Sequence, residues 1–318
     1  RQKSKILALL DEEGVRLDEE DRRYDEMLPP VSLKTRAFVK IQDGCNNFCS
    51  YCIIPYLRGR SRSRTVESAA EEILSAPAEE VVITGIDISS FRDGEKDLAD
   101  LLLAVKDAPC RIRLGSLEVN VVTPRLLDAA KSVRDFAPHF HLSLQSGSDG
   151  VLKKMNRHYT AEEYLQKVEL IRSYFPDAAI TTDVITGFPT ETEEQFAETC
   201  AFVRKVGFSQ IHCFSYSRRT GTNAAKLAEL PAETKKRRLH EMLAIAGQLR
   251  KEYETKFLGK VLELVPEEKK GEYTTGYSQN YIRLYVRGEV LKKARVVAVE
   301  VMEDGLLAVQ EAKGETNG

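Results

Sequence analysis

The chain has 318 residues, about twice the usual size of a domain, so we expect one large domain and a smaller one. Hydrophobic residues make up 42% of the sequence and charged residues 30%, which excludes the disordered, collagen-like and low-complexity classes. No apolar run approaches the ~18 residues of a membrane span, so no membrane partner is expected. The formal net charge of -2 gives no general argument for nucleic acid.

The first two thirds of the sequence alternate between β-branched runs and apolar residues at helical spacing. Strands are predicted at 37–41, 80–84, 111–118, 139–144, 179–186 and 208–214. Helices are predicted at 66–76, 97–107, 124–134, 160–175, 191–206 and 231–257. Successive parallel strands with intervening helices fit either an open doubly wound sheet or a partial β/α barrel, and both folds place their chemistry at the carboxyl ends of the strands.

After residue 257 the pattern changes to short alternating strands separated by turn residues. These strands are predicted at 259–265, 273–276, 281–286, 295–302 and 306–310, with turns at Glu-Lys-Lys-Gly, Gln-Asn and Asp-Gly. Five short strands in about 60 residues predict a small antiparallel β-barrel of the OB type. Residues 313–318 are predicted to be a disordered tail.

Three of the six cysteines lie on one short segment, in the run GCNNFCSYC at residues 44–52 directly after the first predicted strand. This crowding points to metal in a reducing compartment and therefore to a cytoplasmic protein. Three thiolates on one loop can hold three irons of a 4Fe-4S cluster, which leaves the fourth iron open to a small molecule. Two alternatives stay open: a three-cysteine zinc site completed by a distant histidine, and cysteines that merely pack in the core.

The segment from Cys45 through Cys49 and Cys52 to Arg64 resembles the radical S-adenosylmethionine (radical SAM) methylthiotransferases. The resemblance continues through the runs HLSLQSG (141–147), MNR (155–157), TDVITGFPTETEE (182–194) and FSYSRRTGT (214–222). It implies an α/β fold in which a partial (β/α)6 radical SAM barrel at 34–256 precedes an OB-like TRAM barrel at 257–312. Residues 1–33 then correspond to a linker and the remnant of a further N-terminal domain.

The resemblance also implies the cofactors. Cys45, Cys49 and Cys52 would hold a 4Fe-4S cluster, and S-adenosylmethionine would chelate its open iron and be cleaved to a 5'-deoxyadenosyl radical by an electron from a reducing donor. No catalytic residue is implied beyond these ligands. The positions that match the family's S-adenosylmethionine contacts are Tyr51, Thr84, Gly85, Ser116, Glu118, Gln145, Ser146, Asp183, Ile185, Gly187, Phe188 and Tyr216. For Ser116, Gln145 and Tyr216, ordinary hydrogen bonding at a barrel mouth is the alternative.

Methylthiotransferases resemble one another in an N-terminal domain whose three cysteines hold a second 4Fe-4S cluster. No such cysteines precede Cys45, and the sequence opens on Arg-Gln-Lys-Ser without an initiator methionine. We therefore expect a piece of a longer protein that retains radical generation and lacks the sulfur-inserting cluster. The scattered Cys110, Cys200 and Cys213 are predicted to be small apolar packing residues.

The substrate prediction follows the branch of the family. The sequence looks most like the branch that modifies N6-threonylcarbamoyladenosine beside the tRNA anticodon; the isopentenyl-adenosine branch and the branch that modifies a ribosomal-protein aspartate are alternatives. Local basic charge supports contacts to an anticodon stem-loop, and the predicted RNA-binding residues are Arg58, Arg60, Arg62, Arg64, Arg157, Arg218 and Arg219. Tyrosines and arginines between 273 and 287 extend this prediction to the small barrel. The alternatives are a solvated basic face and a non-catalytic RNA-binding module with a structural cluster.

Overall fold

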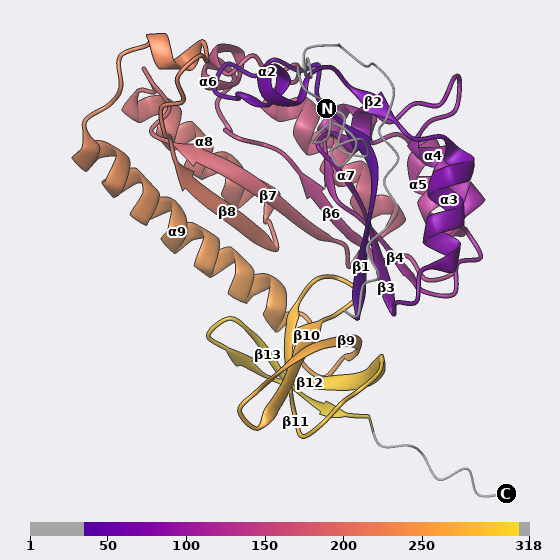
Figure 1. The fold of residues 1–318 in the computed structure, drawn as a ribbon. Coiled ribbons are helices and arrows are strands. Elements are labelled where there is room, and N and C mark those ends of the chain that lie inside the picture. Colours follow the sequence, from indigo (N-terminus) through magenta and orange to yellow (C-terminus); the bar gives the residue numbers. More distant parts are fainter. Residues whose placement is uncertain (1–34, 312–318) are drawn as a thin grey trace, which may run out of the picture.

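The computed structural model describes residues 35–311, so the predicted remnant and tail lie outside the described residues. A curved wall of strands has helices on its outer side, and a small β-barrel lies at one end of that wall (Figure 1). Within the described residues, no helix combines the length and the apolarity that a membrane crossing demands.

The wall confirms the predicted partial barrel and consists of two sheets, with strand orders β2-β1-β3-β4 and β5-β6-β7-β8. Its strands are β1 (Arg36–Asp43), β2 (Arg62–Ser63), β3 (Glu80–Gly85), β4 (Arg111–Leu114), β5 (Ser116–Leu117), β6 (His139–Leu142), β7 (Ala179–Thr186) and β8 (Gln210–Ser215). All neighbouring pairs are parallel except β1 with β2. The single strand predicted at 111–118 divides at Gly115, where an added Cβ would lie 3.0 Å from the Ile83 carbonyl oxygen of the adjacent strand.

The helices follow the predicted apolar spacing closely. They are α3 (Val66–Ser75), α4 (Leu98–Ala104), α5 (Pro124–Ser132), α7 (Ala161–Tyr174), α8 (Glu193–Val206) and α9 (Ala232–Thr255). Thr160 and Thr192 accept hydrogen bonds from the third backbone N–H of α7 and α8, and a side chain of the first turn bonds back to each cap, which explains why the helices begin there. The sequence missed α2 (Ile54–Arg58) and α6 (Asp149–Lys154), because helices of five or six residues show no usable period.

The helices pack against one face of the strands and leave the other face to the interior of the open barrel. Ile41, Ile83 and Val184 are fully buried in the core that the helices share with the strands. Because successive side chains of a strand point to opposite faces, the residues that alternate with these line the concave side. That side carries polar groups, among them Thr181 and Asp183 of β7.

The C-terminal strands form a closed barrel in the order β10-β11-β13-β12-β9. They are β9 (Val261–Lys270), β10 (Tyr273–Tyr277), β11 (Arg283–Arg287), β12 (Ala294–Met302) and β13 (Gly305–Gln310). The pairing is antiparallel except between β11 and β13, which are parallel. The turn expected at Glu-Lys-Lys-Gly was placed too early: β9 continues to Lys270, and Gly271 turns the chain with a φ of 63°.

The small barrel packs against the amino ends of the wall strands. Arg113 of β4 donates two hydrogen bonds to Glu80 of β3 and also bonds the carbonyl oxygens of Ser278 and Gln279 in the barrel. Tyr281 stacks on His139 of β6 with ring centroids 4.4 Å apart. The barrel is therefore fixed at the end of the wall opposite to the carboxyl ends of its strands (Figure 1).

This interface corrects part of the predicted RNA surface of the barrel. Tyr277 stacks on Tyr281 with ring centroids 4.6 Å apart, and the guanidinium groups of Arg36 and Arg113 lie over these rings. Tyr285 is buried, and its hydroxyl donates to Asp304. The mixture of tyrosines and arginines suggested a nucleic-acid surface, but three of the tyrosines pack or bond within the fold itself.

Candidate functional site

The cysteine segment forms a loop at the carboxyl end of β1, and contacts from distant parts of the chain hold it. Gly44 begins the loop with a φ of 73°, and the Cys45 N–H donates to the Gly59 carbonyl oxygen at 3.1 Å. The side-chain amide of Asn156 donates to the carbonyl oxygens of Asn47 and Phe48, each at 3.1 Å. The backbone of the loop is thus fixed by hydrogen bonds rather than by regular secondary structure.

The thiols of this loop lie in a partly buried, polar setting. Burial raises the pKa of the Cys45 thiol to about 12, and the nearby Asp87 carboxylate, 3.8 Å from its sulfur, adds to this rise. Arg157 donates to the Cys49 sulfur at 3.2 Å, and the Asn47 N–H donates to the Cys45 sulfur at 3.4 Å. Thiolates at these positions need a cationic partner, because burial without one favours the neutral thiol.

The spacing of the three sulfurs tests whether one metal ion or a larger group fits. Among the described residues, the cysteine sulfurs do not form a group whose ligand atoms all lie within 4.8 Å of one another. A tetrahedral zinc site holds its sulfurs closer than that, since Zn–S bonds are about 2.3 Å. The three sulfurs are therefore not gathered as a single tetrahedral ion would hold them, whereas a cluster that binds one cysteine per iron does not require such close sulfurs.

Arg157 connects the loop to the strands across the site. Its guanidinium pairs with the Glu118 carboxylate and donates to the Ser143 carbonyl oxygen at 3.1 Å. Burial opposes its charge, but Tyr159 and Glu118 outweigh this and raise the pKa of Arg157 above its ordinary value. The side chain is 4% exposed. The prediction that Arg157 contacts RNA is therefore not supported: this arginine is enclosed within the site.

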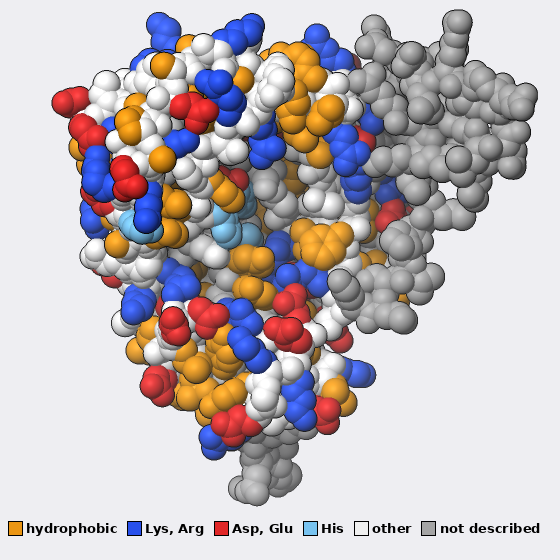
Figure 2. Space-filling view, turned by 60° about the vertical axis from the view of Figure 1, so that its left-hand side comes forward, with side chains coloured by type: hydrophobic (Ala, Val, Ile, Leu, Met, Phe, Trp, Pro, Cys, Tyr) orange, Lys and Arg blue, Asp and Glu red, His pale blue; other side chains and the backbone are white. Residues whose placement is uncertain are grey.

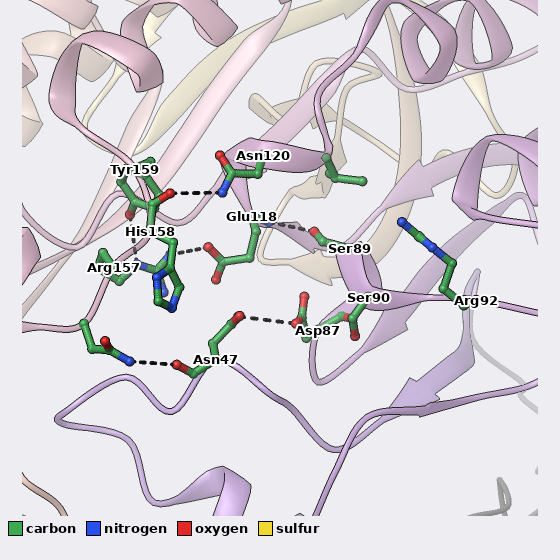
Figure 3. A pocket seen from close by; sticks show the side chains of 12 residues that line it. Asn47, Asp87, Ser89, Ser90, Arg92, Glu118, Asn120, Arg157, His158 and Tyr159 are labelled. Carbon is green, nitrogen blue, oxygen red and sulfur yellow. Dashed lines mark hydrogen bonds and ion pairs between the residues drawn. The ribbon is translucent and has the colours of Figure 1, made fainter.

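A cavity of about 250 Å³ lies beside the cysteine loop, at the carboxyl ends of the strands (Figure 3). Its lining is polar and comes from four separate segments: Asn47, Asp87, Ser89, Ser90, Arg92, Glu118, Asn120, Val121, Asn156, Arg157, His158 and Tyr159. The Asp87 oxygen Oδ1 is buried and has no hydrogen-bond partner among the described residues. Burial raises the pKa of Asp87, although hydrogen bonds from Cys45 and Ser90 and the charge of Arg157 oppose this rise. Of the predicted S-adenosylmethionine contacts, Glu118 lines this cavity.

Other predicted contacts gather in a separate apolar cluster, which includes Tyr51 of the loop. Tyr216 and Phe188 pack edge to face with ring centroids 5.6 Å apart, and Tyr51 and Ile185 pack beside them. Phe188 is fully buried, whereas Tyr51 and Ile185 are half-buried. The Tyr216 hydroxyl is buried without a hydrogen-bond partner among the described residues.

The remaining predicted contacts differ in accessibility. Thr84 and Gly85 at the end of β3 are half-buried, and Ser116 is exposed. Gln145 adopts a φ of 68°, and its backbone bonds both Asp183 and Ile185 of β7.

Two further predicted contacts, Ser146 and Gly187, bond or pack against neighbouring segments of the fold. Ser146 is fully buried, with its hydroxyl 3.1 Å from that of Thr199 in α8. The Gly187 N–H donates to the Glu191 carboxylate, and an added Cβ would meet Lys235. Neither residue lines the cavity of Figure 3.

Of the four arginines between residues 58 and 64, Arg62 and Arg64 form ion pairs within the fold. Arg60 is exposed, with its guanidinium 4.5 Å from the Phe48 ring centroid, and Arg58 is half-buried. Arg62 instead pairs with Asp43 at 2.8 Å with 8% of its side chain exposed, and Arg64 pairs with Glu72. The prediction of four RNA-facing arginines is therefore too broad, because Arg62 and Arg64 stabilise the fold.

The two arginines after β8 are exposed. Arg218 pairs with Glu229 at 2.9 Å. Burial raises the pKa of the Cys52 thiol, and the charge of Arg219 counteracts this rise, which places Arg219 near the cysteine loop.

Asp87 lines the site, although the predicted set of site residues did not include it. Its position two residues after Gly85, at the carboxyl end of β3, is the sequence signal that could have identified it.

Comparisons with known proteins give the family. The family model of the radical SAM superfamily matches residues 39–203. The threonylcarbamoyladenosine tRNA methylthiotransferase MtaB of Bacillus subtilis is 37% identical over 300 residues, which are 89% of this chain and 66% of that protein. The protein of the same name from Thermotoga maritima is 35% identical, over 90% of this chain and 68% of its own length. The tRNA-2-methylthio-N(6)-dimethylallyladenosine synthase of Desulfitobacterium hafniense is 36% identical, with 85% and 63% covered.

Solved structures agree on the fold. The radical S-adenosylmethionine methyltransferase TsrM of Kitasatospora setae superposes with a TM-score of 0.54 at 15% identity, covering 64% of this chain and 43% of that one. Coproporphyrinogen III oxidase (HemN) of Escherichia coli gives 0.50 at 17% identity, with 68% and 53% covered. This chain spans about two thirds of the length of the first curated relatives. The chain belongs to the radical SAM superfamily, and its relatives there are tRNA methylthiotransferases.

Proposed function

We propose that this chain is the S-adenosylmethionine-cleaving part of a tRNA methylthiotransferase that acts on N6-threonylcarbamoyladenosine beside the anticodon. The observation that carries the proposal is the loop of Cys45, Cys49 and Cys52, three free thiols that follow β1 and adjoin a polar cavity at the strand ends. The named relatives supply the reaction class.

In this proposal the three cysteines hold a 4Fe-4S cluster, and S-adenosylmethionine occupies the adjacent cavity. When bound and reduced, the cluster supplies the electron that cleaves S-adenosylmethionine. Arg157 stabilises the Cys49 thiolate by its hydrogen bond and keeps the Glu118 carboxylate in place. The unpartnered oxygen of Asp87, together with Thr84, is suited to accept hydrogen bonds from the ligand's ammonium group.

The proposed substrate rests on the names of the most similar relatives and on how much of this chain each of them covers. The first two curated relatives carry the threonylcarbamoyladenosine name at 37% and 40% identity, over 89% and 84% of this chain. Relatives named for dimethylallyladenosine reach 42% identity over 73% of the chain, which makes isopentenyl-modified tRNA the second candidate. Either substrate implies an anticodon stem-loop partner, a reducing electron donor and work in the cytoplasm. A second 4Fe-4S cluster would be contributed from outside these residues.

The first experiment tests cleavage. The chain is reconstituted anaerobically with iron and sulfide, reduced with dithionite and given S-adenosylmethionine, and 5'-deoxyadenosine is measured by mass spectrometry. We expect 5'-deoxyadenosine from the wild-type chain and none from Cys49→Ala. Cys200→Ala is the matched control, because Cys200 is buried in α8, and it should behave as wild type. Equal product from Cys49→Ala and the wild type would contradict the assigned site.

The second experiment tests the substrate. Anticodon stem-loops carrying threonylcarbamoyl-adenosine, isopentenyl-adenosine or plain adenosine are added to the same reaction. The threonylcarbamoyl stem-loop should stimulate 5'-deoxyadenosine formation most, without methylthiolated product while the second cluster is missing. Preferential stimulation by the isopentenyl stem-loop would transfer the assignment to the second candidate, and methylthiolated product from this chain alone would refute the division of labour between two clusters.

A further inference from the structure

A second group of metal-ligand side chains lies on the concave face of the wall, apart from the cysteine loop and the cavity beside it. His141, Asp183 and His212 come from the adjacent strands β6, β7 and β8, and each offers one ligand atom within 4.8 Å of the other two. The His141 Nε2 lies 3.4 Å from an Asp183 oxygen. Asp183 and His212 are direct neighbours in the β7–β8 register, so the fold itself brings the three together.

The ring of His141 is held in place by a further polar contact. Its Nδ1 lies 3.0 Å from the Thr181 hydroxyl, which also contacts His139 Nε2 at 2.9 Å. This contact on one ring nitrogen leaves Nε2 directed at Asp183. A metal-binding histidine is usually oriented in this way, through a hydrogen bond on the nitrogen that does not bind the metal.

Asp183 and His212 lack the partners that would satisfy them without a cation. Among the described residues, no lysine or arginine forms an ion pair with Asp183, whose side chain is 30% exposed and lies beside His141 and His212. His212 makes no hydrogen bond to another described residue through its ring, although its centroid lies 5.8 Å from that of His141. A half-buried carboxylate between two imidazoles is deficient in positive charge, and a cation would supply it.

The group faces an accessible space. Figure 2 shows histidine side chains, in pale blue, at the surface near the centre of this face of the molecule. His212 lines a cavity of about 210 Å³ together with Thr181 of β7, and residues of α9 and the small barrel also line it. All three side chains are half-buried. Three protein ligands leave at least one coordination position open, and the partial exposure of all three side chains allows water or a small molecule to reach it.

We propose that His141, Asp183 and His212 bind one divalent transition-metal ion, of the zinc or ferrous class, inside the barrel. Two histidines and one carboxylate are the donor set of many catalytic zinc sites and of non-haem iron sites. In such sites ligand atoms are about 3 to 3.5 Å apart, since metal–ligand bonds are about 2.0–2.2 Å. The 3.4 Å contact already meets this spacing, and the His212 ligand atom lies within 4.8 Å of the other two before any ion draws them together. The open position suits an oxygen donor such as water or a substrate carboxylate.

The test uses the reconstituted protein, so that the cysteine loop is already filled, and zinc as the probe. Isothermal titration calorimetry should show one zinc ion per chain. X-ray absorption at the zinc edge should show only nitrogen and oxygen at about 2.0–2.2 Å, without the sulfur shell at about 2.3 Å that binding to cysteine would give. A sulfur shell, or no stoichiometric zinc, would overturn the proposal.

Variants separate the site from adventitious binding. His212→Gln should weaken zinc binding at least about 100-fold, and Thr181→Val should weaken it about 10- to 100-fold through loss of the His141 orientation. His240→Gln is the control, because His240 is exposed on α9 and should bind zinc as the wild type does. Iron content and far-ultraviolet circular dichroism confirm that each variant is folded. Unchanged zinc affinity in His212→Gln would refute the assignment even if the wild type binds one ion.

Discussion

At the scale of single residues, the cysteine loop depends on backbone conformation as much as on its thiols. Gly44 has a positive φ, and a Cβ there would lie 2.0 Å from the Arg60 carbonyl oxygen. The same backbone stretch carries the Cys45 N–H that bonds Gly59. Only glycine allows the backbone at residue 44 to approach the Arg60 carbonyl oxygen this closely. Gly44 therefore helps to set the position of Cys45.

We expect Gly44→Ala to abolish cluster assembly, because the clash must displace the backbone that carries Cys45. The measurement is iron and sulfide per chain after anaerobic reconstitution. Gly94→Ala is the matched control: its φ is +60°, but nothing lies within 4 Å of the added Cβ. That control should lose about 1 kcal/mol of stability to backbone strain and still bind a full cluster. Full iron content in Gly44→Ala would show that the close approach is dispensable.

At the scale of elements, the short antiparallel pair of β1 and β2 decides which arginines are available to a ligand. Gln42 pairs with Ser63 and Asp43 with Arg62, so Arg62 is drawn onto the Asp43 carboxylate. Arg60 lies in the loop before β2 and remains exposed. An alternating arginine run thus contains both a structural ion pair and a side chain free for phosphate.

Salt-dependent RNA binding should separate these two roles. Arg60→Ala should lower the slope of log affinity against log salt for an anticodon stem-loop by about 0.7 to 0.9, the share of one phosphate contact, without changing the unfolding midpoint. Arg62→Ala should lower the free energy of unfolding by about 2 kcal/mol, because Asp43 keeps its ion pair with Lys40 but loses its buried ion pair with Arg62. Filter binding and urea unfolding measure the two effects. An unchanged slope in Arg60→Ala would remove this loop from the RNA surface.

At the scale of the whole molecule, the two barrels are joined through buried charge. Glu80 is fully buried, forms an ion pair with Arg36 at 2.7 Å and accepts hydrogen bonds from Arg113 at 2.7 and 2.8 Å. Arg36 also pairs with Glu267 in the small barrel. The small barrel therefore lies at the amino ends of the strands, whereas the cysteine loop lies at their carboxyl ends (Figure 1). A nucleic acid that contacts both surfaces must span the length of the wall.

Breaking this junction should destabilise both barrels together. Arg113→Ala is expected to cost about 3 kcal/mol, because Glu80 keeps only part of its compensation in a buried setting. Arg287→Ala is the control within the small barrel, since that arginine is exposed and pairs with an exposed Glu272, and it should unfold as the wild type does. Urea unfolding followed by circular dichroism measures both. Equal stability of the two variants would show that the buried network is not what joins the barrels.

The same junction predicts a pH dependence. Burial, together with the neighbouring charges of Arg113 and Arg36, holds the pKa of His139 well below its usual 6.5. The folded state then keeps His139 neutral while the unfolded chain takes up a proton below pH 6.5, so stability falls as the pH drops, by up to about 1.4 kcal/mol per pH unit. His139→Phe should flatten the stability curve between pH 6.5 and 5 relative to wild type, whereas His240→Gln should not. Parallel curves for His139→Phe and wild type would contradict this.

Local sequence determined the elements and located the cysteine loop. The predicted strand at 179–186 is the observed β7, and the predicted helix at 160–175 differs from α7 by one residue at each end, because periodicity and capping act within a few residues. The three cysteines could be recognised in the sequence for the same reason, since all of them lie on one loop. The predicted barrel of five strands also followed from short alternating runs, apart from the parallel β11–β13 pair.

Only the tertiary structure decided the partners of the polar side chains. Arg157 meets a cysteine 108 residues earlier in the chain, and this contact changes its expected role from RNA binding to the site itself. Tyr281 stacks across the junction between the barrels, and His141 meets His212 on the concave face of the wall. These contacts depend on strand order, register and the direction of each side chain. No local pattern encodes them, because each is fixed by packing between segments that are far apart in the sequence.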